Sequence, residues 1–347
     1  MGANTKLLNF TLSAILVALI LIFLYKGHAL LIPFVIAICI WYLIVIFTNS
    51  LEEIPYLGQY IPRWISYIFA ASVAFTIVWI IFNLISNNIS QLITLLPHYQ
   101  ERFIEIKDEF FSFLGVKTQP DFSPAFERYN LVNIMTAIAR ITADIGRNLG
   151  IILIYVLFLL LEHSSFDMKL EALIKDPKQL ESARSVINKI SVQTQSYMRI
   201  KTFIGLLTAG ASYLIMFLVG VNFAEFWALL IFFFNFIPNI GAIVATIFPC
   251  LLALVQFRSY YPFITILISL SSIQFLIGNI LEPRMMGKSF GLSPLAIIVS
   301  LSVWGYLWGI VGMFLCVPIM VIVTIIFANF KATRPISIIL SESGEIK

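Results

Sequence analysis

Residues 226–257 read FWALLIFFFNFIPNIGAIVATIFPCLLALVQF, an uncharged stretch with Pro238-Asn239-Ile240-Gly241 near its middle. Each half holds about 12 to 19 residues, at or below the roughly 20 that a helix needs to cross a bilayer. Proline and glycine both interrupt helices. The stretch therefore predicts two short membrane helices joined by a turn, a helical hairpin. The alternative is a single ordinary span that these residues only kink.

Residues 292–328 repeat this design, because their uncharged run is interrupted at Trp304-Gly305-Tyr306-Leu307-Trp308-Gly309. Each interrupted stretch follows an unbroken apolar span, 203–221 in the first case and 260–281 in the second. The two unbroken spans cross in opposite directions. We therefore expect an inverted repeat with hairpins near 223–257 and 292–328, a pattern that points to the binding site of a transporter.

The composition of the whole chain agrees with a membrane location. Of 347 residues, 60% are hydrophobic and 12% are charged, and the mean hydropathy is +0.96. Soluble proteins carry roughly 25% charged residues. A soluble enzyme, a nucleic-acid binder and a secreted disulfide scaffold are excluded. The chain is predicted to be an all-α polytopic membrane protein with about six to eight transmembrane helices.

Charged residues divide the chain into segments and set its orientation. With both termini in the cytoplasm, the inside segments hold 14 Lys and Arg and the outside segments hold 8, the bias that the positive-inside rule describes. The predicted segments are N-terminal transmembrane helices (1–85), an extracytoplasmic amphipathic segment (86–148), a transmembrane helix (149–161) extended by Leu131–Ile145, a cytoplasmic helical segment (162–202), a transport core (203–330) and a cytoplasmic tail (331–347).

An apolar stripe runs along the extracytoplasmic segment. Its members recur at helical spacing and are Ile89, Leu92, Leu96, Tyr99, Phe103, Ile106 and Phe110. This period predicts an amphipathic helix, which the turn-rich residues 115–120 end. The stripe is too apolar for a solvated helix, so we expect it to rest on the membrane surface or on a neighbouring subunit.

A polar stripe runs along the span 259–281. Ser271, Gln274, Gly278 and Glu282 would share an arc of roughly 80° on one helix face. Such a stripe faces a water-filled path, or it forms hydrogen bonds and close packing between helices. Glu282 is a candidate cation or proton site, or else a surface carboxylate paired with Arg284. Lys201, at the start of an apolar span, is expected to anchor at the headgroup level.

The two hairpin tips are expected to meet near the membrane midplane. Half-helix ends leave backbone N–H and C=O groups unpaired there, available to a polar solute or ion. The alternative is that the aromatic residues of the second tip form an interfacial belt. The candidate substrate pathway comprises Asn235, Pro238, Asn239, Gly241, Ser271, Gln274, Gly278, Asn279, Glu282, Trp304, Gly305 and Gly309.

The sequence contains no motif of an enzyme. It has no GxxxxGK[ST] loop for ATP and no HExxH zinc motif. The three cysteines lie in separate apolar runs and are expected to be buried side chains (Cys39, Cys250 and Cys316). We therefore expect no catalytic residues, no cofactor, no resident metal and no nucleic-acid partner. The expected partners are the lipid bilayer and a small-molecule or ion substrate.

Three strings in the C-terminal half resemble the autoinducer-2 exporter (AI-2E) family, which includes PerM-type permeases. They are Phe236–Gly241, Asn279–Lys288 and Gly291–Pro294. The resemblance implies a transporter of the bacterial inner membrane and a homo-oligomer, such as a pentamer. It implies export of a small solute such as autoinducer-2, with sodium/proton antiport as the alternative. The pattern positions, none with an individual role, are Pro238, Asn239, Gly241, Asn279, Glu282, Pro283 and Gly287.

Antiport normally needs an acidic group near the midplane. The C-terminal block offers only Glu225 and Glu282, and both lie near the ends of spans. The sequence therefore favours export over antiport.

Overall fold

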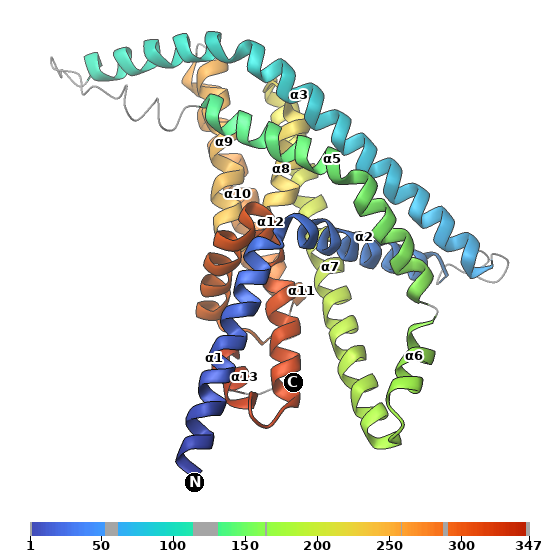
Figure 1. Ribbon diagram of the computed structural model, residues 1–347. Coiled ribbons are helices and arrows are strands. Elements are labelled where there is room, and N and C mark those ends of the chain that lie inside the picture. The colour runs from blue at the N-terminus through green and yellow to red at the C-terminus, as the bar shows by residue number, and fades with distance from the viewer. Residues whose placement is uncertain are drawn as a thin grey trace. The chain divides into compact units, whose positions relative to one another are not determined.

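The computed structural model describes residues 2–52, 62–113, 131–163, 165–257, 259–286 and 291–344 (Figure 1). In these residues the secondary structure is helical, apart from one isolated β-bridge between Leu292 and Ser341. Six described helices are long and apolar enough to cross a membrane. The predicted all-α polytopic class is confirmed.

The described helices, in chain order, are α1 (Gly2–Lys26), α2 (His28–Glu52), α3 (Arg63–Phe113), α5 (Leu131–His163), α6 (Phe166–Leu173), α7 (Pro177–Val219), α8 (Ala224–Phe234), α9 (Ile240–Gln256), α10 (Tyr260–Leu276), the π-helix η1 (Ile277–Leu281), α11 (Glu282–Met286), α12 (Pro294–Asn329) and α13 (Arg334–Leu340). The chain forms two compact units. Unit 1 comprises Met1–Tyr42, Leu149–Thr194 and Gly291–Lys347, and unit 2 comprises Leu43–Asn148 and Gln195–Phe290.

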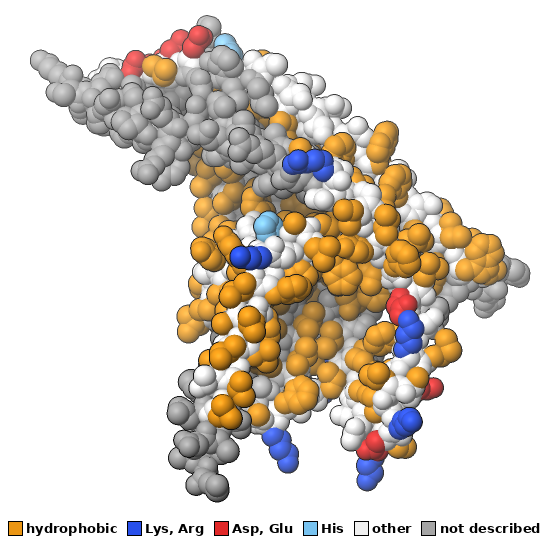
Figure 2. Space-filling model, in the orientation of Figure 1, with side chains coloured by type: hydrophobic (Ala, Val, Ile, Leu, Met, Phe, Trp, Pro, Cys, Tyr) orange, Lys and Arg blue, Asp and Glu red, His pale blue; other side chains and the backbone are white. Residues whose placement is uncertain are grey.

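Hydrophobic side chains cover most of the coloured surface in Figure 2, and charged side chains form only small groups. Large apolar residues of the spanning helices are exposed, among them Phe158, Phe217 and Phe275. Exposure of this much hydrocarbon is unfavourable in water, whereas in a bilayer these side chains contact lipid chains. The surface is therefore that of a multi-pass membrane protein.

One predicted helix join is present. Leu131–Ile145 extends the span that follows it, because α5 is one continuous helix. Pro177 begins α7, where its fixed φ and missing N–H suit the first turn. The third span and the amphipathic segment also form one helix, because α3 runs for 51 residues. The predicted turn at 115–120 lies outside the described residues.

The expected resting place of the apolar stripe is wrong. Ile89, Leu92, Tyr99 and Ile106 are buried in the core of unit 2, together with residues of α7, α8, α9 and α10. The side chains of Leu96, Phe103 and Phe110 lie outside the described residues. The four described residues belong to the core of their own chain because α3 continues past the span and packs on α8 and α9. The helical spacing of these apolar residues predicts only that one face of the helix is buried, and not which surface buries it.

In unit 1, α12 is a hairpin and not one straight helix. Gly309 has φ 62° and ψ −140°, a left-handed conformation that favours glycine. Ser300 Oγ donates a hydrogen bond to Cys316 O at 3.2 Å, although sixteen residues of straight helix would separate them by about 24 Å. A Cβ on Gly312 would lie 1.9 Å from the Trp304 carbonyl oxygen. The chain therefore turns back on itself at Gly309.

The tip of this second hairpin packs on the end of α1. Trp308 Nε1 donates to Leu24 O at 3.0 Å, and the rings of Tyr25 and Tyr306 stack with centroids 6.4 Å apart. Lys26 follows directly, and a lysine at the end of a span marks a membrane boundary. The midplane tip and the interfacial belt both stay predictions for these aromatic residues, of which Trp308 is buried.

The predicted C-terminal tail folds back against the start of this hairpin. Helix α13 follows α12, and Ser337 Oγ donates to Thr324 O at 3.1 Å. Ser293 N donates to Leu340 O at 2.9 Å, and Glu342 N donates to Gly291 O at 2.7 Å. The described part of the tail is thus an integral part of unit 1.

Candidate functional site

The first hairpin, in unit 2, consists of α8 and α9 joined by residues 235–239. Ile237 N donates to Phe234 O at 2.9 Å, and Asn239 has a positive φ of 59° with ψ −54°. A Cβ on Gly241 would lie 1.8 Å from the Phe234 carbonyl oxygen. Only glycine permits this close approach. The break predicted at Pro238–Gly241 is therefore a tight, well-packed tip.

A buried ion pair holds this tip. Lys201 on α7 pairs with Glu282, the first residue of α11, and the Lys201 side chain is 6% exposed while that of Glu282 is 19% exposed. Lys201 Nζ also donates to the backbone oxygen of Asn235 at 2.9 Å. One ammonium group therefore joins α7, the C-terminal end of α8 and the start of α11, three elements labelled in Figure 1.

Both acceptors of this ammonium are electronegative. Asn235 is the C-cap of α8, so its carbonyl lies at the negative end of the helix dipole. Glu282 adds a full negative charge. Leaving either charge of a buried pair without its partner costs about 3–5 kcal/mol. The ion pair therefore stabilises the tip strongly. If it separates, Lys201 and Glu282 each need another group of opposite charge, or water, in place of the lost partner.

The Asn235 side chain indicates how deep the tip lies. Its Nδ2 donates to Thr208 Oγ1 at 3.0 Å, and Thr208 donates in turn to Ile204 O of its own helix. Thr208 lies eleven residues before Val219, the end of α7. At 1.5 Å per residue this is about 16 Å, roughly half of a 30 Å hydrocarbon core. Since α8 is only 11 residues long, a re-entrant hairpin fits this geometry.

The polar stripe of α10 does not continue to Glu282 as predicted. Residues 277–281 form the π-helix η1, whose wider turn holds about one residue more than an α-helical turn. Glu282 is thereby rotated by roughly 100° from the face of Ser271 and Gln274. Ser271, Gly278 and Asn279 are exposed and Gln274 is half-buried. The rotation turns Glu282 towards Lys201 instead.

The remaining candidates divide between the two units. Pro238 is half-buried and Asn239 exposed at the first tip, while Trp304 and Gly305 are half-buried and Gly309 exposed at the second. The first tip belongs to unit 2 and the second to unit 1. Their meeting near the midplane stays a prediction.

A polar clasp closes the base of the first hairpin. Gln256, the last residue of α9, accepts from Asn222 N and donates to Gly220 O, both at 2.7 Å. Asn222 Nδ2 donates to Tyr99 Oη of α3 at 3.1 Å. The two ends of the hairpin are therefore tied to each other and to α3, so movement at the tip need not open the base.

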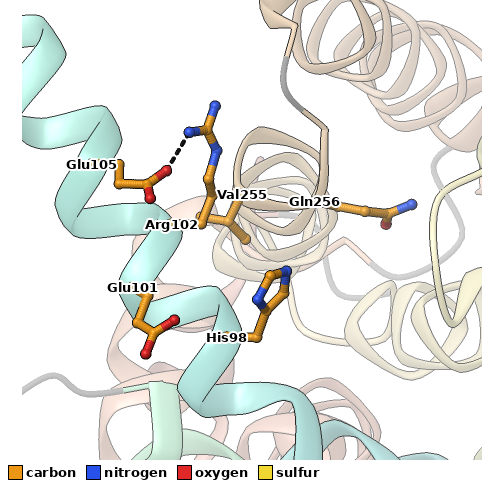
Figure 3. A pocket seen from close by; sticks show the side chains of 6 residues that line it. All are labelled: His98, Glu101, Arg102, Glu105, Val255 and Gln256. Atoms are coloured by element: carbon orange, nitrogen blue, oxygen red, sulfur yellow. Dashed lines mark hydrogen bonds and ion pairs between the residues drawn. The ribbon is translucent and has the colours of Figure 1, made fainter.

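A small pocket lies beside this clasp (Figure 3). It is lined by His98, Glu101, Arg102 and Glu105 of α3 with Val255 and Gln256 of α9, and its volume is about 120 Å³. Ligand pockets usually measure roughly 300–1,000 Å³. The hydrogen bond to the Glu105 carboxylate raises the pKa of Arg102, so this side chain stays a cation. The pocket is smaller than an ordinary ligand pocket and lies beside the clasp.

Two of these contacts were not expected. Lys201 was predicted to anchor at the headgroups, and this interpretation is wrong because its ammonium is buried against Glu282 and Asn235. Glu282 pairs with Lys201 and not with the exposed Arg284. A lysine at the edge of a span has the same sequence pattern whether it reaches outward to lipid headgroups or inward to a carboxylate. No signal in the sequence distinguished the outward orientation of the Lys201 side chain from the inward one.

Comparison with known proteins gives a consistent result. The family model "AI-2E family transporter" matches residues 12–332. A putative transport protein of Borreliella burgdorferi is 34% identical over 74% of this chain and 70% of its own length. The AI-2 transport protein TqsA of Escherichia coli is 29% identical over 90% of both chains. The putative permease PerM of Escherichia coli is 28% identical over 41% of this chain and 40% of its own length.

Proposed function

This chain belongs to the AI-2E transporter family, and we propose that it exports a small polar solute, autoinducer-2 or a related signalling molecule or metabolite. The observation that supports the proposal is the first hairpin, whose tip would lie about halfway across the bilayer if α7 ends at its surface. A broken helix at this depth is the usual construction of a transporter binding site. The proposed location is the bacterial cytoplasmic membrane, with both termini in the cytoplasm and the chain in a homo-oligomer.

The tip supplies the groups that a polar solute needs. Asn239 is exposed, and its side chain carries an amide that can bind a polar solute. The ends of α8 and α9 also present backbone groups that lack helical partners. Lys201 Nζ donates a hydrogen bond to the Asn235 carbonyl oxygen, so this oxygen is not free to bind a solute. Passage of a solute past the tip therefore requires this contact to open, while the clasp at Gln256 keeps the base of the hairpin fixed.

Export is favoured over cation/proton antiport. The relative that matches across 90% of both chains carries the name of an AI-2 transport protein. Antiport would use Glu282 as a carboxylate that alternately takes a cation and a proton, but Glu282 is paired with Lys201. The comparisons give antiport no support.

Reconstitution in proteoliposomes tests the proposal. Labelled autoinducer-2 should accumulate faster in vesicles that contain the protein than in empty vesicles, and a sodium pulse should not change the signal of a pH-sensitive dye. Thr208→Val removes the acceptor of the Asn235 amide and should change the rate by roughly fivefold, since one neutral hydrogen bond contributes about 1 kcal/mol. Thr265→Val is the matched control, because Thr265 donates only to Tyr261 O of its own helix in the described contacts.

Two outcomes would contradict export. One is equal accumulation of labelled autoinducer-2 in vesicles that contain the protein and in empty vesicles. The other is a proton movement that depends on sodium in the wild type, which would restore the antiport alternative.

A further inference from the structure

The surroundings of the Lys201 ammonium are those of a small cation. Its described acceptors are a backbone carbonyl oxygen of Asn235 and a carboxylate oxygen of Glu282. Carbonyl and carboxylate oxygens are also the ligands that hard metal cations prefer in proteins. The recess that they form is anionic, because a helix C-terminus and a carboxylate converge on one point.

We propose that this recess is a monovalent-cation site whose occupant is the tethered ammonium of Lys201, so that the wild-type chain binds no free sodium there. A lysine suits this position because its ammonium is a compact point charge on a flexible stem, whereas the planar guanidinium of arginine is shaped for bidentate partners. The covalent tether keeps the cation within reach of both oxygens at any salt concentration. Transport by the wild type, if the proposed export is correct, then needs no coupling ion at this site.

Removal of the lysine makes the site visible. Lys201→Ala deletes the ammonium and most of its methylene stem, and leaves Glu282 beside the Asn235 carbonyl without a positive charge. A buried carboxylate without a partner is strongly destabilising. A sodium ion with one or two waters can enter the vacated volume and bind the same two oxygens. The stability of the variant should therefore depend on which cation the buffer contains.

A purely structural salt bridge makes the opposite prediction. In that case Lys201→Ala loses stability to the same extent in every buffer of equal ionic strength. Lys169 provides the matched control, because it pairs with Glu162 in an exposed ion pair whose side chains are 63% and 51% exposed. Water already solvates both groups of that pair, so Lys169→Ala should show no preference between cations.

The experiment measures the melting temperature of the full chain in detergent, in sodium chloride and in N-methylglucamine chloride at equal ionic strength. For Lys201→Ala we expect a saturable rise of about 3–5 °C in sodium at a hundredfold excess over its Kd. Radioactive sodium should bind this variant at one ion per chain. The wild type and Lys169→Ala should differ by less than about 1 °C between the two salts.

The double variant Lys201→Ala/Glu282→Gln keeps the test decisive. It removes both charges, so it should fold in either salt and bind no radioactive sodium. If Lys201→Ala folds only when Glu282 is also replaced, even in saturating sodium, sodium does not substitute for the ammonium and the proposal is overturned. It is equally overturned if Lys201→Ala has the same melting temperature in both salts, or if the wild type binds sodium at this site.

Transport is measured separately. Export by the wild type in proteoliposomes should be equal in sodium and N-methylglucamine buffers. Absence of any solute export would refute the proposed function and leave the binding result to judge the cation site by itself. A wild-type export rate that rises with sodium would refute the absence of coupling at this site.

Discussion

Gly241→Ala should destabilise the first hairpin, because the added methyl group has no room. Its Cβ would lie 1.8 Å from the Phe234 carbonyl oxygen and 2.8 Å from the Phe234 carbonyl carbon. Both atoms belong to the backbone, so no rotamer change relieves the overlap. Overpacking of this kind costs about 1–3 kcal/mol, and more where the backbone cannot move. The melting temperature should therefore fall by roughly 1.5–4 °C.

Gly210→Ala is the matched control for this experiment. Gly210 lies in α7 of the same unit, and a Cβ at this position would have no atom within 4 Å. Alanine is the better helix former by about 0.5–1 kcal/mol, so the control should be neutral or slightly stabilising. Thermal unfolding in detergent, followed by size-exclusion chromatography with fluorescence detection, measures both variants. Equal melting temperatures for the two variants would refute the tight tip.

Four further predictions follow from the same structure. Glu282→Gln leaves the Lys201 ammonium buried without its countercharge and should lower stability by about 3–5 kcal/mol. Glu225→Gln replaces an exposed carboxylate in the first turn of α8 and should change stability by less than about 0.5 kcal/mol, so equal effects on the melting temperature would contradict the buried pair. Leu92→Ala should cost about 2–5 kcal/mol with no change in oligomer mass, whereas loss of the oligomer alone would place the stripe at a subunit interface. Asn239→Gly keeps the positive φ and removes the amide, so export should slow without a fall in melting temperature; an unchanged export rate would remove this side chain from the pathway. In a chain without its native cysteines, Lys117→Cys should react with an impermeant thiol reagent from the outside, and labelling only from the cytoplasmic face would reverse the topology.

The helical elements were largely predictable from local pattern. Uncharged runs of about 20 residues give spans in any context, because a charge in hydrocarbon is costly. Pro177 at the start of α7 and the break at Pro238–Gly241 follow from backbone chemistry that acts over a few residues. The continuity of α3 beyond its span was not expected, because a change from an apolar to an amphipathic pattern resembles a boundary between two elements.

The candidate site was only partly predictable. Asn235 and Glu282 stood out as polar residues in apolar surroundings, but the partner of Glu282 lies 81 positions earlier in the chain. Glu282 would share a face with Ser271 only in a regular α-helix, and the π-helix η1 interrupts that regularity. A π-turn has no reliable signature in a single sequence, so the direction of Glu282 could not be worked out from spacing.

The amino-acid sequence by itself determined that this chain is a helical membrane protein, where its helices break and which glycines and prolines stand at the breaks. These properties depend on hydrophobicity and on φ and ψ preferences, which act within about one helical turn. The tertiary structure decided that the described side chains of the apolar stripe of α3 are buried in their own unit, and that Lys201 turns inward to Asn235 and Glu282. Apolar burial and charge pairing are satisfied by any suitable partner in space, so only the packing of helices distant in the chain selects which partner is used.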